Sequence, residues 1–202
     1  MKLYSSRFAP SPRRVRMYAA EKGLALEFVE VDIAAGATQA PAFLAVNPLG
    51  ELPVLELADG TRLTESLAIC RWLEEQHPEP DLFGRTPRER AAVNAWIDRL
   101  MSRLYLPLTQ VFRHSHPYWA TRLEQVPRWA QIQRAAVQEE FAALDAALVD
   151  REFLARAQFS MADIVAFTTI SFGKPSKLVV GEQHPNLQRW FGALAARPSA
   201  AA

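Results

Sequence analysis

The sequence predicts a mixed α/β domain followed by a domain built only from helices. The first part of the chain alternates between short strand-like runs and helical segments, whereas the rest shows helical periodicity without a strand pattern. A proline-rich stretch, HPEP, followed by Gly84, separates the two parts. We therefore expect a first domain at residues 1–78, a linker at 79–87 and an all-helical domain at 88–202.

Composition and charge argue against several classes of protein. The 202 residues carry a formal net charge of +1, so no global field favours nucleic acid or an anionic membrane as a partner. Cys70 is the single cysteine, which excludes an intramolecular disulfide and a zinc site built on several cysteines. We expect no metal. The start lacks the apolar core of a secretory signal, and no long apolar stretch follows, so we expect a cytoplasmic protein.

The first domain is predicted to follow the order β-α-β-α-β-β-α. Ser11 before Pro12 is typical of a helix N-cap followed by proline at the first helical position. Asp59-Gly60 between two short apolar runs predicts a hairpin. The expected elements are strands at 2–6, 26–31, 52–57 and 61–63, and helices at 11–23, 41–47 and 65–77.

Capping motifs mark the helices of the second domain. Thr86-Pro87-Arg88-Glu89 is a capping box that opens a helix extending past residue 104, which Pro107 should kink or end. Ser160 and Asp163 form a second box before an apolar run, and we interpret Asp163 as a structural cap. Further helices are expected at 127–149 and after His184-Pro185, and the tail PSAAA is expected to be disordered.

Four segments in this order resemble the cytosolic glutathione transferase family over essentially the whole chain. They are the helix start SPRRVR, NPLGELPVLEL, TESLAICRWLEE and FSMADI. The style of the motifs is similar to the non-tyrosine classes, in particular the bacterial, zeta and theta-like ones. The resemblance implies a thioredoxin-like first domain that binds glutathione, a helical domain that shapes a pocket for a small hydrophobic electrophile, and a homodimer.

Pro53 is the first predicted glutathione-binding position. Proline cannot donate to a strand ladder, so its place within an apolar strand-like run needs an explanation. The resemblance implies a cis Leu52–Pro53 bond that turns the backbone of Leu52 outward, where it pairs with the peptide glutathione. The alternative is a trans proline at the beginning of a strand.

Glu65 and Ser66 are predicted to hold the γ-glutamyl end of glutathione. Free N–H groups at a helix start favour a carboxylate, the Ser66 hydroxyl adds a donor, and Glu65 can accept from an ammonium group. The alternative is plain capping begun by Thr64. Many relatives place a lysine or glutamine just before the cis-proline, where this chain has Gly50-Glu51. We therefore expect Gln39, or alternatively an arginine from elsewhere in the chain, to bind the glycyl carboxylate.

Ser11 is the predicted catalytic residue. The thiolate of glutathione is the nucleophile, and both a hydroxyl hydrogen bond and a helix N-terminus favour that anion. Tyr4, Ser5 and Ser6 are alternatives, and simple capping is the structural reading of Ser11. We expect Cys70 to be buried and inert. Three residues are expected to line the electrophile pocket: Phe8, Tyr105 and Phe112.

Glutathione conjugation to an apolar electrophile is the function that the resemblance implies. Two alternatives remain open from the sequence. One is a protein of the same fold that binds or regulates without transferase activity. The other is a glutathione-dependent isomerase, peroxidase or lyase that uses the same site.

Overall fold

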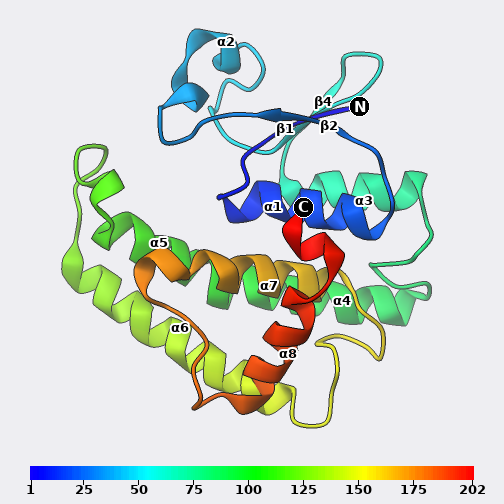
Figure 1. The fold of residues 1–202 in the computed structure, drawn as a ribbon, viewed down its shortest axis with the longest axis vertical. Helices are drawn as coiled ribbons and strands as arrows, with labels where there is room; N and C mark the ends of the chain where they lie inside the picture. Colours follow the sequence, from blue (N-terminus) through cyan, green and yellow to red (C-terminus); the bar gives the residue numbers. More distant parts are fainter. The chain divides into compact units, whose positions relative to one another are not determined.

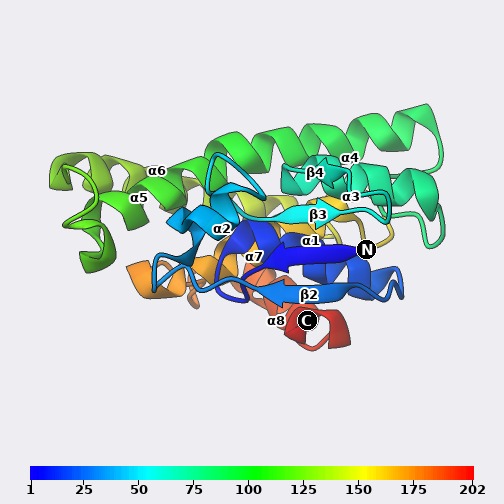
Figure 2. The same ribbon diagram turned by 90° about the horizontal axis from the view of Figure 1, so that it is seen from above.

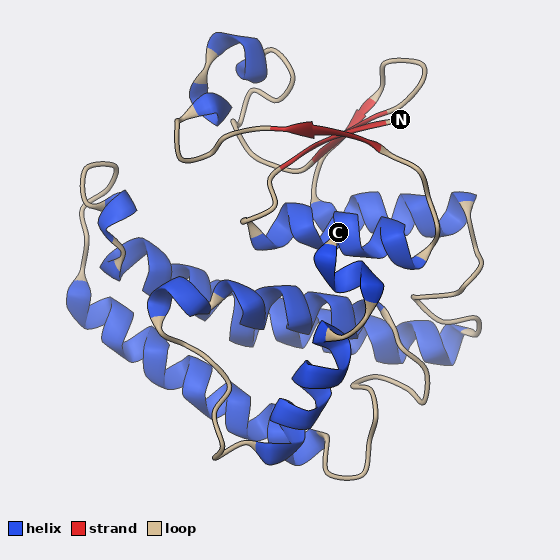
Figure 3. Cartoon of the chain, in the orientation of Figure 1, coloured by secondary structure: helices blue, strands red, loops and turns tan.

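A computed structural model describes all residues from 1 to 202, which form two compact units. The first unit contains Met1–Asp81 together with Pro198–Ala202, and the second contains Leu82–Arg197. Strands occur only in the first unit, and the second is entirely helical between its loops (Figure 1, Figure 3). The predicted fold class, α/β followed by all-α, is confirmed. None of the helices is both long and apolar enough to span a membrane.

The sheet of the first unit has four strands in the order β2-β1-β3-β4 (Figure 2). The central strand β1 pairs in parallel with β2 and antiparallel with β3, which continues through the predicted hairpin into β4. Alternation along β1 gives the sheet two different faces, because Leu3 is fully buried whereas Tyr4 packs on a small cluster formed by Val31, Phe43 and Val54. The strands are β1 Lys2–Ser5, β2 Glu27–Glu30, β3 Val54–Glu56 and β4 Arg62–Leu63.

Two long helices of the first unit, α1 and α3, lie side by side along one face of the sheet, and α2 lies beyond the other (Figure 1). Their inward faces cover the strands through fully buried apolar residues such as Val15, Ile69 and Leu73. The helices of the unit are α1 Pro10–Glu21, the short η1 Ala37–Gln39, α2 Pro41–Leu44, α3 Ser66–Gln76 and, from the end of the chain, η5 Pro198–Ala201.

The start of α1 differs from the prediction. The N-cap is Ala9, in extended conformation, and Pro10 and Ser11 are the first two helical residues. The expectation that Ser11 caps the helix is therefore wrong. Pro10 allows the earlier start because its fixed φ suits a first helical position and its missing N–H costs nothing there.

The C-terminal tail is ordered, contrary to expectation. Residues Pro198–Ala201 form a 3-10 turn that packs on α1. The Ser199 hydroxyl donates to the carboxylate of Glu21, and Arg13 Nη2 donates to the carbonyl of Ala200 at 3.3 Å. These polar contacts fix a segment whose small side chains give no apolar pattern in the sequence.

The second unit begins with the predicted capping box. Glu89 N–H donates to Thr86 Oγ1 at 3.2 Å, and Thr86 N–H donates to Glu89 Oε2 at 3.0 Å. A π-helical turn interrupts the first long helix just before Pro107, which then lies in the first turn of the next helix, where its missing N–H is tolerated. The elements are α4 Pro87–Leu100, η2 Met101–Tyr105, α5 Leu106–Ser115, η3 Pro117–Trp119, α6 Pro127–Ala147, α7 Met161–Phe172, η4 Lys174–Ser176 and α8 Pro185–Ala195.

The buried carboxylate of Asp163 joins three segments of the second unit. It accepts hydrogen bonds from Ser160 N–H at 3.0 Å and the Ser160 hydroxyl at 2.9 Å, which confirms the structural reading of this residue. It also accepts from Leu154 N–H at 3.0 Å and from Trp190 Nε1 in α8 at 3.1 Å. Burial raises the pKa of the Asp163 carboxyl, and the four donors oppose that shift by favouring the ionised form.

Replacing Asp163 should therefore cost more than the loss of a helix cap. We expect Asp163→Ala to lower the free energy of unfolding by about 3 kcal/mol or more, because it leaves buried donors without an acceptor. Asp163→Asn keeps one acceptor oxygen and should cost less. Urea unfolding followed by circular dichroism measures both, with the exposed Asp150→Ala as control. A loss of only about 1 kcal/mol for Asp163→Ala would reduce this residue to a simple cap.

Candidate functional site

The loop before β3 presents a free stretch of backbone. The Leu52–Pro53 peptide is cis, as predicted. Strand β3 begins only at Val54, and its register with β1 starts there, so the peptide groups of Leu52 lie outside the sheet ladder. The Leu52 side chain packs on the cluster beyond the sheet, which anchors this segment. Its backbone is thus available to an extended peptide ligand.

Gln39 lies against the same loop. Gly50 has φ +64°, and a Cβ placed there would lie 2.4 Å from Gln39 Nε2 and 2.9 Å from the carbonyl of Thr38. Only glycine permits this approach. The structure therefore brings the exposed side chain of Gln39 to the loop that leads into Pro53, a proximity that the sequence did not indicate.

Asn47 holds this loop and was missed as a functional residue. Its side chain is buried, donates from Nδ2 to the carbonyl of Glu51 at 2.8 Å and accepts from Leu49 N–H at 3.2 Å. The sequence signal was present, because asparagine before proline is typical of a turn held by its own side chain. We interpreted it as a turn and not as a support for the binding loop.

Helix α3 begins at Ser66 without a conventional cap. The N-cap is Glu65, which has no side-chain cap hydrogen bond, so the alternative of plain capping begun by Thr64 is not observed. Glu65 is exposed and has φ +63° and ψ +111°, a conformation that costs a non-glycine residue energy. Such strain is kept where the position of a side chain matters, and here it sets the carboxylate at the N-terminus of a helix.

Ser66 is buried and accepts a hydrogen bond from α1. Arg14 Nη1, in α1, donates to Ser66 Oγ at 2.7 Å, and both residues are almost fully buried. Arg14 was not recognised from the sequence, because an arginine in a basic segment such as SPRRVR is ordinarily solvated. A signal was available: Arg14 lies four residues before Tyr18 and is thus on the same helix face as a residue of the core.

The hydroxyl groups proposed for catalysis lie in different surroundings. Tyr4 OH donates to Glu56 at 3.4 Å, and its ring packs edge-on against Phe43. Ser5 is fully buried and accepts from Arg16 Nη1 at 3.3 Å. Ser11 is half-buried in the first turn of α1, where the helix dipole favours an anion. Ser6, which follows β1, is buried as well. Of these four hydroxyl groups, only that of Ser11 belongs to the first turn of a helix.

Cys70 is buried in the middle of α3, as expected. Burial raises the pKa of its thiol, so the reactive thiolate is disfavoured. The two neighbouring histidines of α5 and the following loop are also engaged: His114 Nδ1 accepts from Val126 N–H, and His116 Nδ1 accepts from Tyr118 N–H. No group of three histidine, cysteine or acidic side chains lies close enough together to hold a metal ion.

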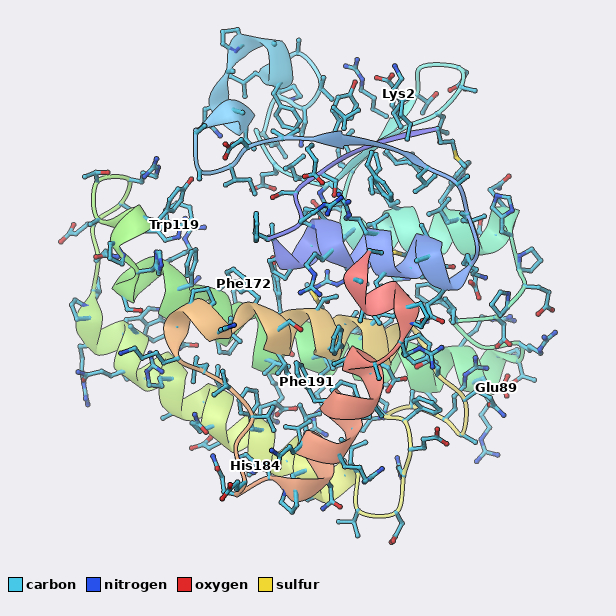
Figure 4. The ribbon with its side chains drawn as sticks, in the orientation of Figure 1. Lys2, Glu89, Trp119, Phe172, His184 and Phe191 are labelled. Atoms are coloured by element: carbon cyan, nitrogen blue, oxygen red, sulfur yellow. The ribbon has the colours of Figure 1, made fainter.

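The residues predicted for the electrophile pocket are divided between the two units. Phe8 belongs to the first unit and is 89% exposed, which is unusual for a large apolar side chain. Tyr105 ends the π-helical turn of the second unit. The ring of Phe112 packs edge-on against those of Phe172 and Trp119, with ring centroids 5.0 and 6.5 Å away. Figure 4 labels Phe172 and Trp119 in this part of the second unit. The second unit therefore offers an aromatic cluster around Phe112.

Comparisons with known proteins agree with this arrangement. The family model for the N-terminal domain of glutathione S-transferase matches residues 8–76, and the one for the C-terminal domain matches residues 112–198. "Glutathione S-transferase 2" of Saccharomyces cerevisiae is 33% identical over 98% of this chain and 87% of its own.

Two solved structures are similar along nearly their whole length. Gtt2 from Saccharomyces cerevisiae has a TM-score of 0.91 at 33% identity and covers 98% of both chains. A glutathione S-transferase domain-containing protein from Marinobacter aquaeolei VT8 has a TM-score of 0.89 at 35% identity and covers 98% of this chain and 99% of its own.

The strained conformation of Glu65 yields a prediction about stability. Glu65→Gly and Glu65→Ala both remove the carboxylate, but only glycine relieves the unfavourable φ. We expect Glu65→Gly to be more stable than Glu65→Ala by about 1 kcal/mol, because the backbone cost of about 1–3 kcal/mol is released. Thermal and urea unfolding of the two variants measure the difference. Equal stability would mean that Glu65 relaxes to an ordinary conformation.

Proposed function

Since this chain belongs to the glutathione S-transferase family, we propose that it conjugates the thiolate of glutathione to a small apolar electrophile. The observation that carries the proposal is the Glu65–Ser66 pair, with its strained backbone, at the open N-terminus of α3. A fold kept only for its stability has no need of this pair. The carboxylate of Glu65 can accept a hydrogen bond from the ammonium group of a γ-glutamyl residue, and the hydroxyl of Ser66 can donate one to its carboxylate.

Each part of glutathione has a proposed partner in the first unit. Glu65 accepts from the γ-glutamyl ammonium group, and Ser66 with the first N–H groups of α3 binds the α-carboxylate. The backbone of Leu52, next to Pro53, pairs with the cysteinyl residue as a neighbouring strand does. Gln39 donates to the glycyl carboxylate, whose charge the exposed Glu51 would oppose at close range.

Ser11 is proposed to stabilise the thiolate. The first three helical residues of α1 are Pro10, Ser11 and Pro12, so only Ser11 carries an N–H there. It therefore offers a hydroxyl and a backbone amide at the positive end of a helix dipole. With these donors the thiol gives its proton to solvent and remains an anion. The sulfur lone pair then forms the bond to the electrophilic carbon, and a leaving group departs with its electron pair.

The electrophile is proposed to contact Phe8, Tyr105 and Phe112. Aromatic side chains offer apolar area and stacking surface to a planar or hydrophobic molecule. We also propose a homodimer, a cytoplasmic location and a role in detoxification, for which family membership is the support.

Glutathione binding is the first test of this function. Calorimetry of the natural chain should give a dissociation constant between micromolar and millimolar. The double variant Glu65→Ala, Ser66→Ala should bind at least about tenfold more weakly, because charge-assisted hydrogen bonds contribute about 1.5–3 kcal/mol. Glu75→Ala, at the exposed far end of α3, is the matched control. No binding of millimolar glutathione by the natural chain would exclude the transferase function and favour a regulatory or binding role for the fold.

The role of Ser11 is tested separately. We expect Ser11→Ala to raise the pKa of the bound glutathione thiol, because one donor to the anion is lost, and so to shift the pH–rate profile to higher pH. At neutral pH kcat should fall about tenfold or more, with KM little changed. Thiolate absorbance of the complex and steady-state rates measure both. Tyr4→Phe is the control, and an effect in that variant instead would assign catalysis to Tyr4.

A further inference from the structure

A line of residues with hydroxyl, thiol or charged side chains, all buried except the half-buried Glu74, runs between α1 and α3, directly behind the Glu65–Ser66 pair. We call it the polar column. On each helix its members are spaced four residues apart, so they share the face that meets the other helix, and the two helices run side by side (Figure 1). The column consists of Arg14 and Tyr18 on α1 with Lys22 at the C-cap of that helix, and of Ser66, Cys70 and Glu74 on α3.

The end of the polar column far from the site is an ion pair. Lys22 Nζ lies 2.5 Å from Glu74 Oε2 and donates to the carbonyl of His77 at 2.6 Å. Tyr18 OH donates to the same carboxylate oxygen at 2.5 Å. This end ties α1 to the last turn of α3, so the helices hold a fixed register.

At the end of the polar column next to the site, Arg14 donates a hydrogen bond to Ser66. A guanidinium has donors and no acceptor, so Ser66 Oγ must be the acceptor in this 2.7 Å contact. The hydroxyl hydrogen of Ser66 therefore points away from Arg14 and can be donated to another acceptor. Without Arg14 the hydroxyl would be free to rotate and to act as donor or acceptor.

We infer that Arg14 is a positioning residue that makes the site select thiol peptides carrying an α-carboxylate on the γ-glutamyl residue. It fixes Ser66 as a donor toward that carboxylate. It also places a buried positive charge, 1% exposed, behind the N-terminus of α3, where low polarity strengthens its attraction for an anion. This inference rests on the proposed function, since it concerns the recognition of glutathione at the same site.

A pair of ligands tests the selection directly. Glutathione is compared with γ-aminobutyryl-cysteinyl-glycine, which has the same thiol, amine and glycyl end but lacks the α-carboxylate. The measured quantity is the preference for glutathione, which is the dissociation constant of the analogue divided by that of glutathione, obtained by calorimetry for each variant. A general loosening of the site weakens the binding of both ligands equally and leaves this ratio unchanged. A specific loss of carboxylate recognition weakens only the binding of glutathione and so lowers the ratio.

We expect the natural chain to prefer glutathione by about tenfold or more, as for a hydrogen bond to a charged group. Arg14→Met should reduce this preference to about threefold or less, and Ser66→Ala should do the same. Because Arg14 acts largely through Ser66, the double variant should lose less of the preference than the sum of the two single losses. Arg14→Lys keeps a charged donor and should restore part of the preference.

Folding of the variants is checked by circular dichroism and thermal unfolding. Should Arg14→Met not fold, Arg14→Gln takes its place with the same expected loss, because its neutral amide ends two atoms short of the position of Nη1. An unchanged ratio in a folded Arg14 variant would overturn the inference and leave the proposed function intact. Absence of glutathione binding by the natural chain would overturn both.

Discussion

The hydrogen bond between Arg14 and Ser66 connects the two helices whose N-termini make the candidate site. It is short, buried and formed across the α1–α3 interface, so the position of either helix depends on the other. The Lys22–Glu74 contact fixes the same interface at its far end. Because β1 leads into α1 and β4 leads into α3, this register also determines where the loops that follow those strands lie. The geometry of the candidate site therefore depends on the packing of α1 against α3 as well as on the loops.

Unfavourable backbone conformations and close contacts occur where the ligand is proposed to bind. Glu65 has an unfavourable backbone conformation, and Gly50 permits a close approach to Gln39 that any larger residue would prevent. Asn47 secures the turn at residues 47–51, which contains Gly50, through two hydrogen bonds. A rigid scaffold supports such features, because only a well-packed structure holds residues in conformations that they would otherwise leave. In the second unit, the single carboxylate of Asp163 holds together a loop, the start of a helix and Trp190 through hydrogen bonds.

Much of the fold was accessible from local signals in the sequence. The hairpin at Asp59-Gly60, the capping box at Thr86 and the box at Ser160 each place donors and acceptors within four residues, so their geometry depends little on the rest of the chain. Local reasoning failed at the start of α1, where two prolines compete for the first helical position, and at the tail, which is held by contacts with residues far away in the sequence.

By itself, the sequence determined the order of the elements and the change from a mixed to an all-helical part, because periodicity and capping depend on residues close together in the chain. The family resemblance of its motifs predicted the cis Leu52–Pro53 bond, which the structure contains. Only the tertiary structure decided that Arg14 supports Ser66, that Gln39 meets the loop before Pro53 and that Asp163 binds Trp190. These pairs are separated by between 11 and 52 positions in the chain. Whether a charged residue faces water or a buried partner depends on which helices pack together, and no local pattern contains that information.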